Sequence, residues 1–206
     1  MPDRLSSKGR TVTVVLLVAI LGSMAGTAGD GIAAQTFPDV PPAEDCDAQE
    51  VDLSEIELLL EFPVLYIPER PSQHADADPG NAQSGIEELV WTSVSCVNAN
   101  QPLRWLSLFT EGYWLERFGP NYPDDFAAFR VAASREARPA GVEDQLEILA
   151  VDSAMLLEDG RWSTSVTTQN RETRFVDELV VVWDGETWLI DEFRAGEELA
   201  VVDGEA

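Results

Sequence analysis

Asp152 is the residue whose type and neighbours in the sequence best suit general-base chemistry. Side chains alternate between the two faces of an extended strand. Asp152 would therefore share its face with four apolar residues, Ile148, Ala150, Ala154 and Leu156. Burial among apolar groups makes a carboxylate a stronger base. Asp152 is thus the candidate for a catalytic base, although a solvent-exposed carboxylate at a strand end or edge is the preferred interpretation.

The chain is also rich in large aromatic side chains, which could line a ligand cavity. The candidates for such a ligand-binding set are Trp91, Tyr113, Trp114, Trp162 and Trp188. Aromatic residues at helical or strand spacing are more often part of a core, and this is the preferred interpretation of any single one. Tyr113 or a tryptophan could instead donate a hydrogen bond in an enzyme that uses Asp152 as its base.

Carboxylates gather near the C-terminus at Asp177, Glu178, Asp191 and Glu192. A solvated face paired with Arg174 and Arg194 is a better interpretation of this patch than a metal site. Residues 74–78 (HADAD) resemble metal ligands, but a flexible loop rarely holds a specific metal without further ligands. The sequence has no Gly-rich phosphate loop, paired-cysteine motif or nucleophile elbow. We therefore expect neither a metal site nor a cofactor.

The formal net charge of the 206 residues is −25 at pH 7. A surface this acidic repels phosphate groups, so no nucleic-acid partner is expected. Residues 1–34 have the parts of an export signal: a basic start, an apolar run over residues 11–24 and small residues up to Ala34. An uncleaved membrane anchor is the alternative, but the run is short for a span of about 20 residues. We expect an exported protein of the cell envelope or the medium.

Export changes the interpretation of Cys46 and Cys96, because oxidising compartments favour pairing. A bridge between them would close a loop of about 50 residues, for which the chain-entropy relation gives roughly 4 kcal/mol. Two buried free thiols are the alternative. We predict the disulfide, with a structural role.

The apolar pattern separates an N-terminal part from one compact domain. Residues 35–83 are predicted as an extended arm, a short helix over residues 52–60 and a Pro-rich linker. The domain is predicted over residues 84–195, and residues 196–206 as a loose acidic tail.

Three helices should open the domain, because apolar residues recur there at helical spacing. The first starts at Ser84, the second runs without a break from about Pro102 to Phe118, and the third covers residues 123–137. Residues 146–157, residues 162–168 and the two arms of a hairpin over residues 174–194 then form a four-stranded antiparallel meander.

The hairpin turns at Asp184-Gly185-Glu186, and charge distinguishes two registers. A turn centred on Asp184-Gly185 brings like charges opposite each other, which is unfavourable. A turn centred on Gly185-Glu186 pairs Trp183 with Trp188 and Asp177 with Arg194, and it is the preferred register. On the first strand of this hairpin, one face is shared by Phe175, Asp177, Leu179, Val181 and Trp183.

Residues 96–99 (CVNA), residues 103–110 (LRWLSLFT) and the hairpin with residues 188–191 (WLID) are similar to segments of the nuclear transport factor 2-like (SnoaL-like) superfamily. The resemblance covers about residues 84–194. Together with the leader and Cys46, it suggests an exported bacterial member. It implies an α+β fold in which N-terminal helices pack on a strongly curved antiparallel sheet, as a cone-shaped barrel.

The superfamily contains isomerases, dehydratases, polyketide cyclases and non-enzymatic binding modules, so the fold alone does not choose among them. No catalytic residue of the superfamily carries over to this chain. We therefore expect an exported, non-catalytic domain that binds a small apolar ligand or a protein partner in or around the cone. The alternatives are a small cofactor-free isomerase or cyclase with Asp152 as general base, and a homodimer formed through the outer face of the sheet.

Overall fold

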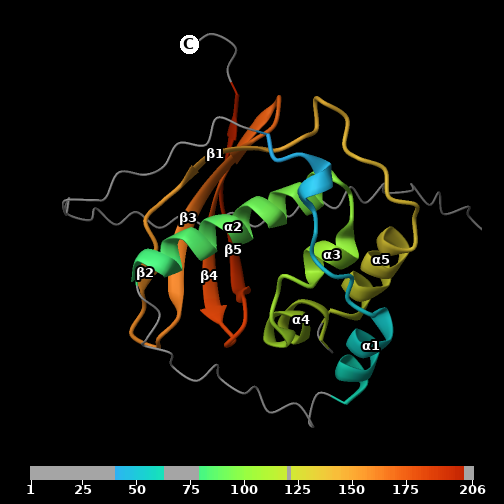
Figure 1. The fold of residues 1–206 in the computed structure, drawn as a ribbon. Coiled ribbons are helices and arrows are strands. Elements are labelled where there is room, and N and C mark those ends of the chain that lie inside the picture. Colours follow the sequence, from blue (N-terminus) through green and yellow to red (C-terminus); the bar gives the residue numbers. More distant parts are fainter. Residues whose placement is uncertain (1–39, 63–78, 120–121, 202–206) are drawn as a thin grey trace, which may run out of the picture.

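The computed structural model describes residues 40–62, 79–119 and 122–201. Within these residues the chain contains five α-helices and one antiparallel sheet of five strands, which does not close on itself (Figure 1). The helices precede the strands in the sequence. The predicted α+β class is confirmed.

The helix α1 (Leu53–Glu61) begins after Asp52, whose carboxylate accepts a hydrogen bond from the backbone N–H of Ser54 at 2.8 Å. Such a cap satisfies one of the N–H groups that the first turn of a helix leaves unpaired. The short helix predicted over residues 52–60 is therefore present, shifted by one residue.

The helix α2 (Pro79–Asn98) lies along one side of the sheet. It buries Ile86, Leu89, Val90 and Val94 of the predicted apolar stripe, whereas Val97 is exposed. It starts five residues before Ser84, so the assignment of residues 79–83 to the linker was wrong. The side chain of Gln83 explains the extension, because its Oε1 accepts a hydrogen bond from the N–H of Ala154 at 2.7 Å. The first turns of α2 are thus attached to the strand region.

The predicted long second helix is interrupted. It forms α3 (Pro102–Leu106) and α4 (Glu111–Phe118), separated by residues that pair with the sheet. The N–H of Ile190 donates to the carbonyl of Leu108 at 2.8 Å, and the N–H of Thr110 donates to the carbonyl of Ile190 at 3.0 Å. These backbone groups bond to a strand instead of to a helical turn, so the helix cannot continue through them.

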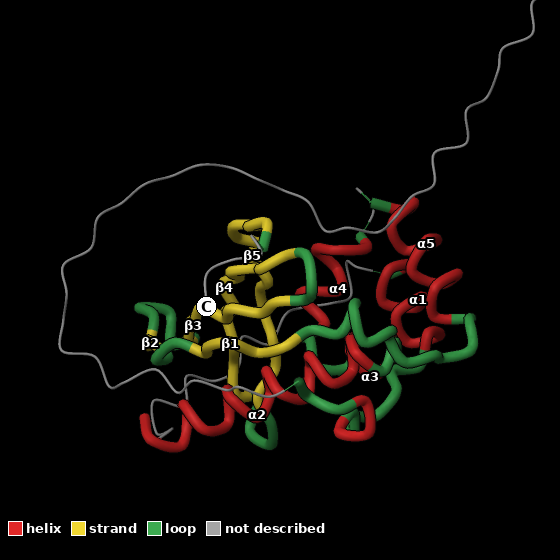
Figure 2. The backbone as a smooth tube through the Cα atoms, turned by 90° about the horizontal axis from the view of Figure 1, so that it is seen from above, coloured by secondary structure: helices red, strands yellow, loops and turns green. Residues whose placement is uncertain are grey.

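The helix α5 (Pro123–Ala133) is shorter than predicted and ends at Ser134. Phe126 and Phe129 pack on Phe118, with ring centroids 5.6 and 5.1 Å apart. This pair anchors α5 to α4. Figure 2 shows α2 along one face of the sheet and the other four helices gathered to one side.

The sheet has the strand order β1-β3-β4-β5, with β2 also paired to β3. Its strands are β1 (Glu147–Val151), β2 (Met155–Leu156), β3 (Trp162–Gln169), β4 (Thr173–Trp183) and β5 (Trp188–Ala200). The predicted strand over residues 146–157 is thus divided in two. Each pair of neighbouring strands is antiparallel.

The register at the hairpin turn is the preferred one: Trp183 lies opposite Trp188, and Gly185 has a positive φ of 113°. A bulge then adds Asp191 to β5, because Val180 pairs with Glu192 while Val181 pairs with Ile190. The bulge shifts the rest of the strand by one residue. Arg194 therefore lies opposite Glu178, and the predicted pairing with Asp177 was wrong.

The strand β5 continues to Ala200, which pairs with Thr173. Residues 196–200 are therefore part of the sheet, and the prediction of a loose tail from residue 196 was wrong for them. A second bulge occurs where Ala195 and Gly196 both lie opposite Asp177. Bulges bend a strand and increase its twist, so two of them make β5 the most distorted strand of this sheet.

Cys46 and Cys96 form the predicted disulfide, which joins the N-terminal arm to α2. Around it, the guanidinium of Arg104 donates to the carbonyl of Cys46 at 2.8 Å, and the side-chain amide of Asn98 donates to the carbonyl of Pro41 at 3.0 Å. The arm is therefore a docked part of the domain.

The predicted leader and the HADAD segment lie outside the described residues. Among the described helices, none has the length and hydropathy needed to cross a membrane.

Candidate functional site

Two of the five candidate ligand-binding aromatic residues are committed to structural hydrogen bonds. The indole N–H of Trp91 donates to the carboxylate of Asp45 at 3.0 Å, which holds the N-terminal arm. The indole N–H of Trp114 donates to the carbonyl of Leu106 at 3.0 Å, which joins α4 to α3. Both side chains follow the core interpretation.

The other three candidates, Tyr113, Trp162 and Trp188, are buried in the main core. The rings of Trp162 and Trp188 meet edge to face, with centroids 6.5 Å apart. The ring of Tyr113 packs against Phe109 at 4.4 Å, and burial raises the pKa of its hydroxyl. Apart from the contact between Trp162 and Trp188, the five aromatic residues take part in separate hydrogen bonds and packing contacts.

Asp152 follows the last residue of β1, and its side chain is exposed. Its backbone is fixed, because its N–H donates to the carbonyl of Ser165 at 2.9 Å and its carbonyl accepts from the hydroxyl of Thr164 at 2.7 Å. An irregularity between Ile148 and Ala150 breaks the strict alternation on which the apolar pocket depended. Asp152 is thus the strand-end carboxylate of the preferred interpretation.

The four hairpin carboxylates are divided between the two sides of the sheet. We call the side covered by α2 the helix-facing side; Val166, Leu179 and Val181 lie on it and belong to the core. The opposite side is the outer side, and it carries Glu178 and Glu192. Asp177 is on the helix-facing side, so its inclusion in the outer acidic patch was wrong.

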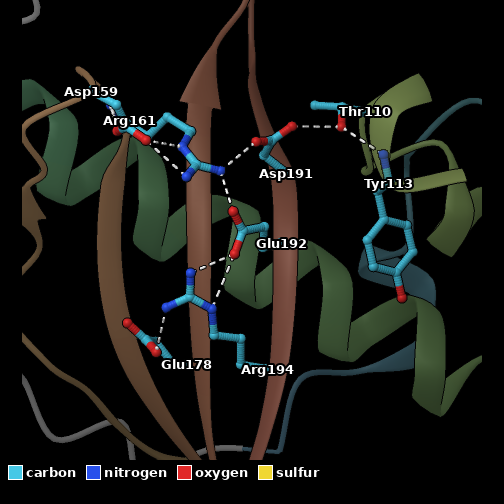
Figure 3. Close-up of polar contacts among 8 residues, drawn as sticks. All are labelled: Thr110, Tyr113, Asp159, Arg161, Glu178, Asp191, Glu192 and Arg194. Carbon is cyan, nitrogen blue, oxygen red and sulfur yellow. Dashed lines mark hydrogen bonds and ion pairs between the residues drawn. The ribbon is translucent and has the colours of Figure 1, made fainter. Parts of the chain in front are cut away.

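On the outer side, Arg161 and Arg194 form ion pairs with carboxylates (Figure 3). Arg161 bonds to Asp159 and Asp191, at 2.8 Å each, and also to Glu192. Arg194 bonds to Glu178 at 3.1 Å and to Glu192. The predicted partner Arg174 donates to Gln169 instead.

This network changes the acidity of its members. Burial alone would raise the pKa of Glu192, but hydrogen bonds from Arg161 and Arg194 outweigh burial and lower it. Burial alone would lower the pKa of Arg161, and its hydrogen bonds to the carboxylates raise it. Each of these six charged groups has an oppositely charged partner, so they form a structural ion-pair network on the outer side.

Asp191 connects this network to the helices. One of its carboxylate oxygens accepts from Arg161, and the other accepts from the hydroxyl of Thr110 at 2.9 Å (Figure 3). The same hydroxyl accepts from the N–H of Tyr113 and so caps α4. The roles of Thr110 and Arg161 were not predicted from the sequence. Thr110 directly precedes Glu111, and a threonine before an acidic residue of a first helical turn is the signal that could have suggested a cap.

The helix-facing side carries a different group of residues, where β4 begins and β5 ends. In Figure 1 these parts of the two strands extend beyond α2. Phe175 and Asp177 share the face of Leu179, while Thr168 and Val166 lie opposite them on β3 and Phe193 lies opposite Leu179 on β5. We call the set formed by Val166, Thr168, Phe175, Asp177 and Phe193 the Asp177 site.

Three members of the Asp177 site, Phe175, Asp177 and Phe193, are half-buried. Burial raises the pKa of Asp177, and the hydrogen bond that its carboxylate accepts from the N–H of Gly196 at 3.2 Å acts in the opposite direction. Only glycine fits at position 196, where β5 lies close to β4, because a Cβ atom there would lie 1.7 Å from the carbonyl oxygen of Val176. The alternation of β4 placed Asp177 beside Leu179 and Val181, so the sequence contained the signal for this site.

Among the described residues, no group of three His, Cys, Asp or Glu side chains could hold a metal ion. The Asp177 site contains a partly desolvated carboxylate beside two partly exposed aromatic rings. These groups can bind a ligand. Comparisons with protein-family models, with curated proteins and with solved structures found no match.

Proposed function

We propose that this chain is an exported, non-enzymatic domain of the nuclear transport factor 2-like (SnoaL-like) kind, which binds a small and largely apolar molecule at the Asp177 site. The element order supports the superfamily, because helices precede an antiparallel sheet. The two bulges in β5 support the strong curvature that a cone-shaped barrel needs. The cone-shaped barrel and the membership of this superfamily are therefore both proposed here.

The observation that supports the binding function is the partial exposure of the aromatic rings and the carboxylate at the Asp177 site. Core positions of a sheet are normally covered, yet Phe175 and Phe193 keep part of their rings exposed next to a half-buried carboxylate. Ligand sites typically combine apolar and aromatic walls with a few polar groups that orient the ligand. The Asp177 site has both components on one side of one sheet.

The disulfide supports export. A bridge between Cys46 and Cys96 is consistent with an oxidising compartment, where such bonds persist. The basic and apolar pattern of residues 1–34 adds the leader that export requires.

The enzymatic alternative needed Asp152 in an apolar pocket, and its side chain is exposed. Tyr113, its proposed hydrogen-bond donor, is a core residue on α4. The binding function is therefore the one that the geometry favours.

A fluorescence titration with the neutral probe N-phenyl-1-naphthylamine tests the proposal. The Phe175→Ala variant should weaken probe binding about five- to tenfold, since burying one more aromatic face contributes about 1 kcal/mol or more. The matched control is Phe62→Ala, because Phe62 is also partly exposed and follows α1, away from the sheet. No binding to the wild-type protein, or equal losses in both variants, would contradict the proposal.

A further inference from the structure

Resting on the proposed function, we infer that the ligand of the Asp177 site carries a cationic head group, such as a protonated amine, on its apolar body. The carboxylate of Asp177 would bind the head group, and the rings of Phe175 and Phe193 would contact the body. This identifies the chemical class of the ligand, which the proposed function leaves open.

The carboxylate of Asp177 has fewer hydrogen bonds than it can accept. An ionised carboxylate can accept about four hydrogen bonds. In the described part of the chain, Asp177 accepts one, from the N–H of Gly196 at 3.2 Å, and takes part in no ion pair. Its remaining acceptor capacity is free for a ligand that donates.

Among the described residues, no cationic side chain forms an ion pair with Asp177. Arg194 lies on the outer side, bonded to Glu178 and Glu192. Arg174, which directly precedes Phe175 and lies on the outer face of β4, donates both of its bonds to Gln169. A half-buried charge without a counter-ion is unfavourable, and an external cation would relieve that cost.

The charge of the site selects between anionic, neutral and cationic ligands. An anionic ligand would be repelled by Asp177 and by a chain whose net charge is −25. A neutral donor would form a hydrogen bond, but a bond between two charged groups is roughly twice as strong. Aromatic faces also attract cations, so Phe175 and Phe193 favour the same head group.

The test uses three probes with the same aromatic body: naphthalen-1-ylmethylamine, naphthalen-1-ylmethanol and 1-naphthoic acid. Isothermal titration at pH 7 and low salt should show that the amine binds at least tenfold more tightly than the alcohol, and that the acid does not bind. Equal affinities for amine and alcohol, or binding of the acid, would overturn the inference. This comparison uses the wild-type protein, so it does not depend on how a variant folds.

A variant then locates the effect. Asp177→Asn should reduce the affinity for the amine to that for the alcohol, which it should leave unchanged. The control Glu197→Gln removes the same charge from an exposed residue opposite Val176, on the other side of the same hairpin. Unchanged amine binding in Asp177→Asn, or the same loss in Glu197→Gln, would overturn the inference.

The outcomes separate the two proposals. If N-phenyl-1-naphthylamine binds and depends on Phe175, but the three head groups are not distinguished, the cationic class is wrong and the binding function stands. If neither that probe nor the amine binds, the proposed function fails and the inference fails with it.

Discussion

Gly85 on α2 lies directly against the indole ring of Trp188 on β5. A Cβ atom at position 85 would be 2.3 Å from Nε1 and 2.4 Å from Cδ1 of that ring. Trp188 cannot easily move away, because its ring also packs against Trp162 and Trp183, with centroids 6.5 and 5.6 Å apart. The helix therefore approaches the hairpin end of the sheet more closely than any side chain would allow.

Gly85→Ala should destabilise the protein by about 1–3 kcal/mol, the usual cost of overpacking a core. In an exposed helix the same change would stabilise by about 1 kcal/mol, so the sign of the effect is diagnostic. Urea unfolding followed by tryptophan fluorescence measures it. Gly141→Ala is the control, because the nearest atom to a Cβ there is a side-chain oxygen of Asp144 at 3.5 Å. A stabilised Gly85→Ala would show that α2 does not approach Trp188 in this way.

Thr110→Ala should lower the free energy of unfolding by about 1–2 kcal/mol, because it removes the cap of α4. It also removes the hydrogen bond to Asp191 that joins α4 to β5. Thr110→Ser keeps the hydroxyl and should lose less than half as much stability. If both variants lost the same amount in chemical denaturation, the hydroxyl would not be the important group.

Asp177 should make the protein less stable as the pH rises. Burial raises its pKa above the usual 3.8, so the folded state holds the proton more tightly than the unfolded state. Its stabilising contribution is therefore complete below pH 3.8 and is lost as the pH rises through the folded-state pKa. Asp177→Asn should be more stable than the wild type at pH 7, and the difference should disappear below pH 3.8. A less stable variant at pH 7 in urea unfolding would contradict this.

Glu192 should have the opposite dependence. Its pKa is below the usual 4.5 because the hydrogen bonds from Arg161 and Arg194 outweigh burial. Its contribution is present above pH 4.5 and is lost as the pH falls through the folded-state pKa. Glu192→Gln should therefore reduce stability at pH 7 and matter less in acid. The variant should also flatten the acid limb of a plot of unfolding free energy against pH, and an unchanged acid limb would argue against the ion pairs.

The disulfide should be complete and protected in the folded protein, since Cys46 and Cys96 are 3% and 0% exposed. Denatured protein should take up no iodoacetamide without reductant and two equivalents after reduction, as read by intact mass. Replacing both cysteines with alanine should cost roughly 4 kcal/mol, the chain-entropy value for a loop of this length. Two adducts without reductant would show that the bond is absent in solution.

Turn and cap chemistry could be predicted from the sequence because it involves neighbouring residues. Gly185 supplies the positive φ of the hairpin turn, and like charges disfavour the other register. Asp52 caps α1 through a residue two positions away. The pairing of Cys46 with Cys96 also followed from composition, because the chain has two cysteines.

The chain departs from these local patterns where tertiary contacts join segments that are distant in the sequence. The break between α3 and α4 exists because the backbone of Leu108 and Thr110 bonds to Ile190, about 80 residues away. The bulge at Asp191 turns that carboxylate toward Thr110 and Arg161, and it shifts Arg194 from Asp177 to Glu178. A period of two residues predicts which face a side chain occupies, and it correctly grouped Asp177 with Leu179. It does not predict which partners a bulge brings together, because those contacts join strands and helices that are distant in the sequence.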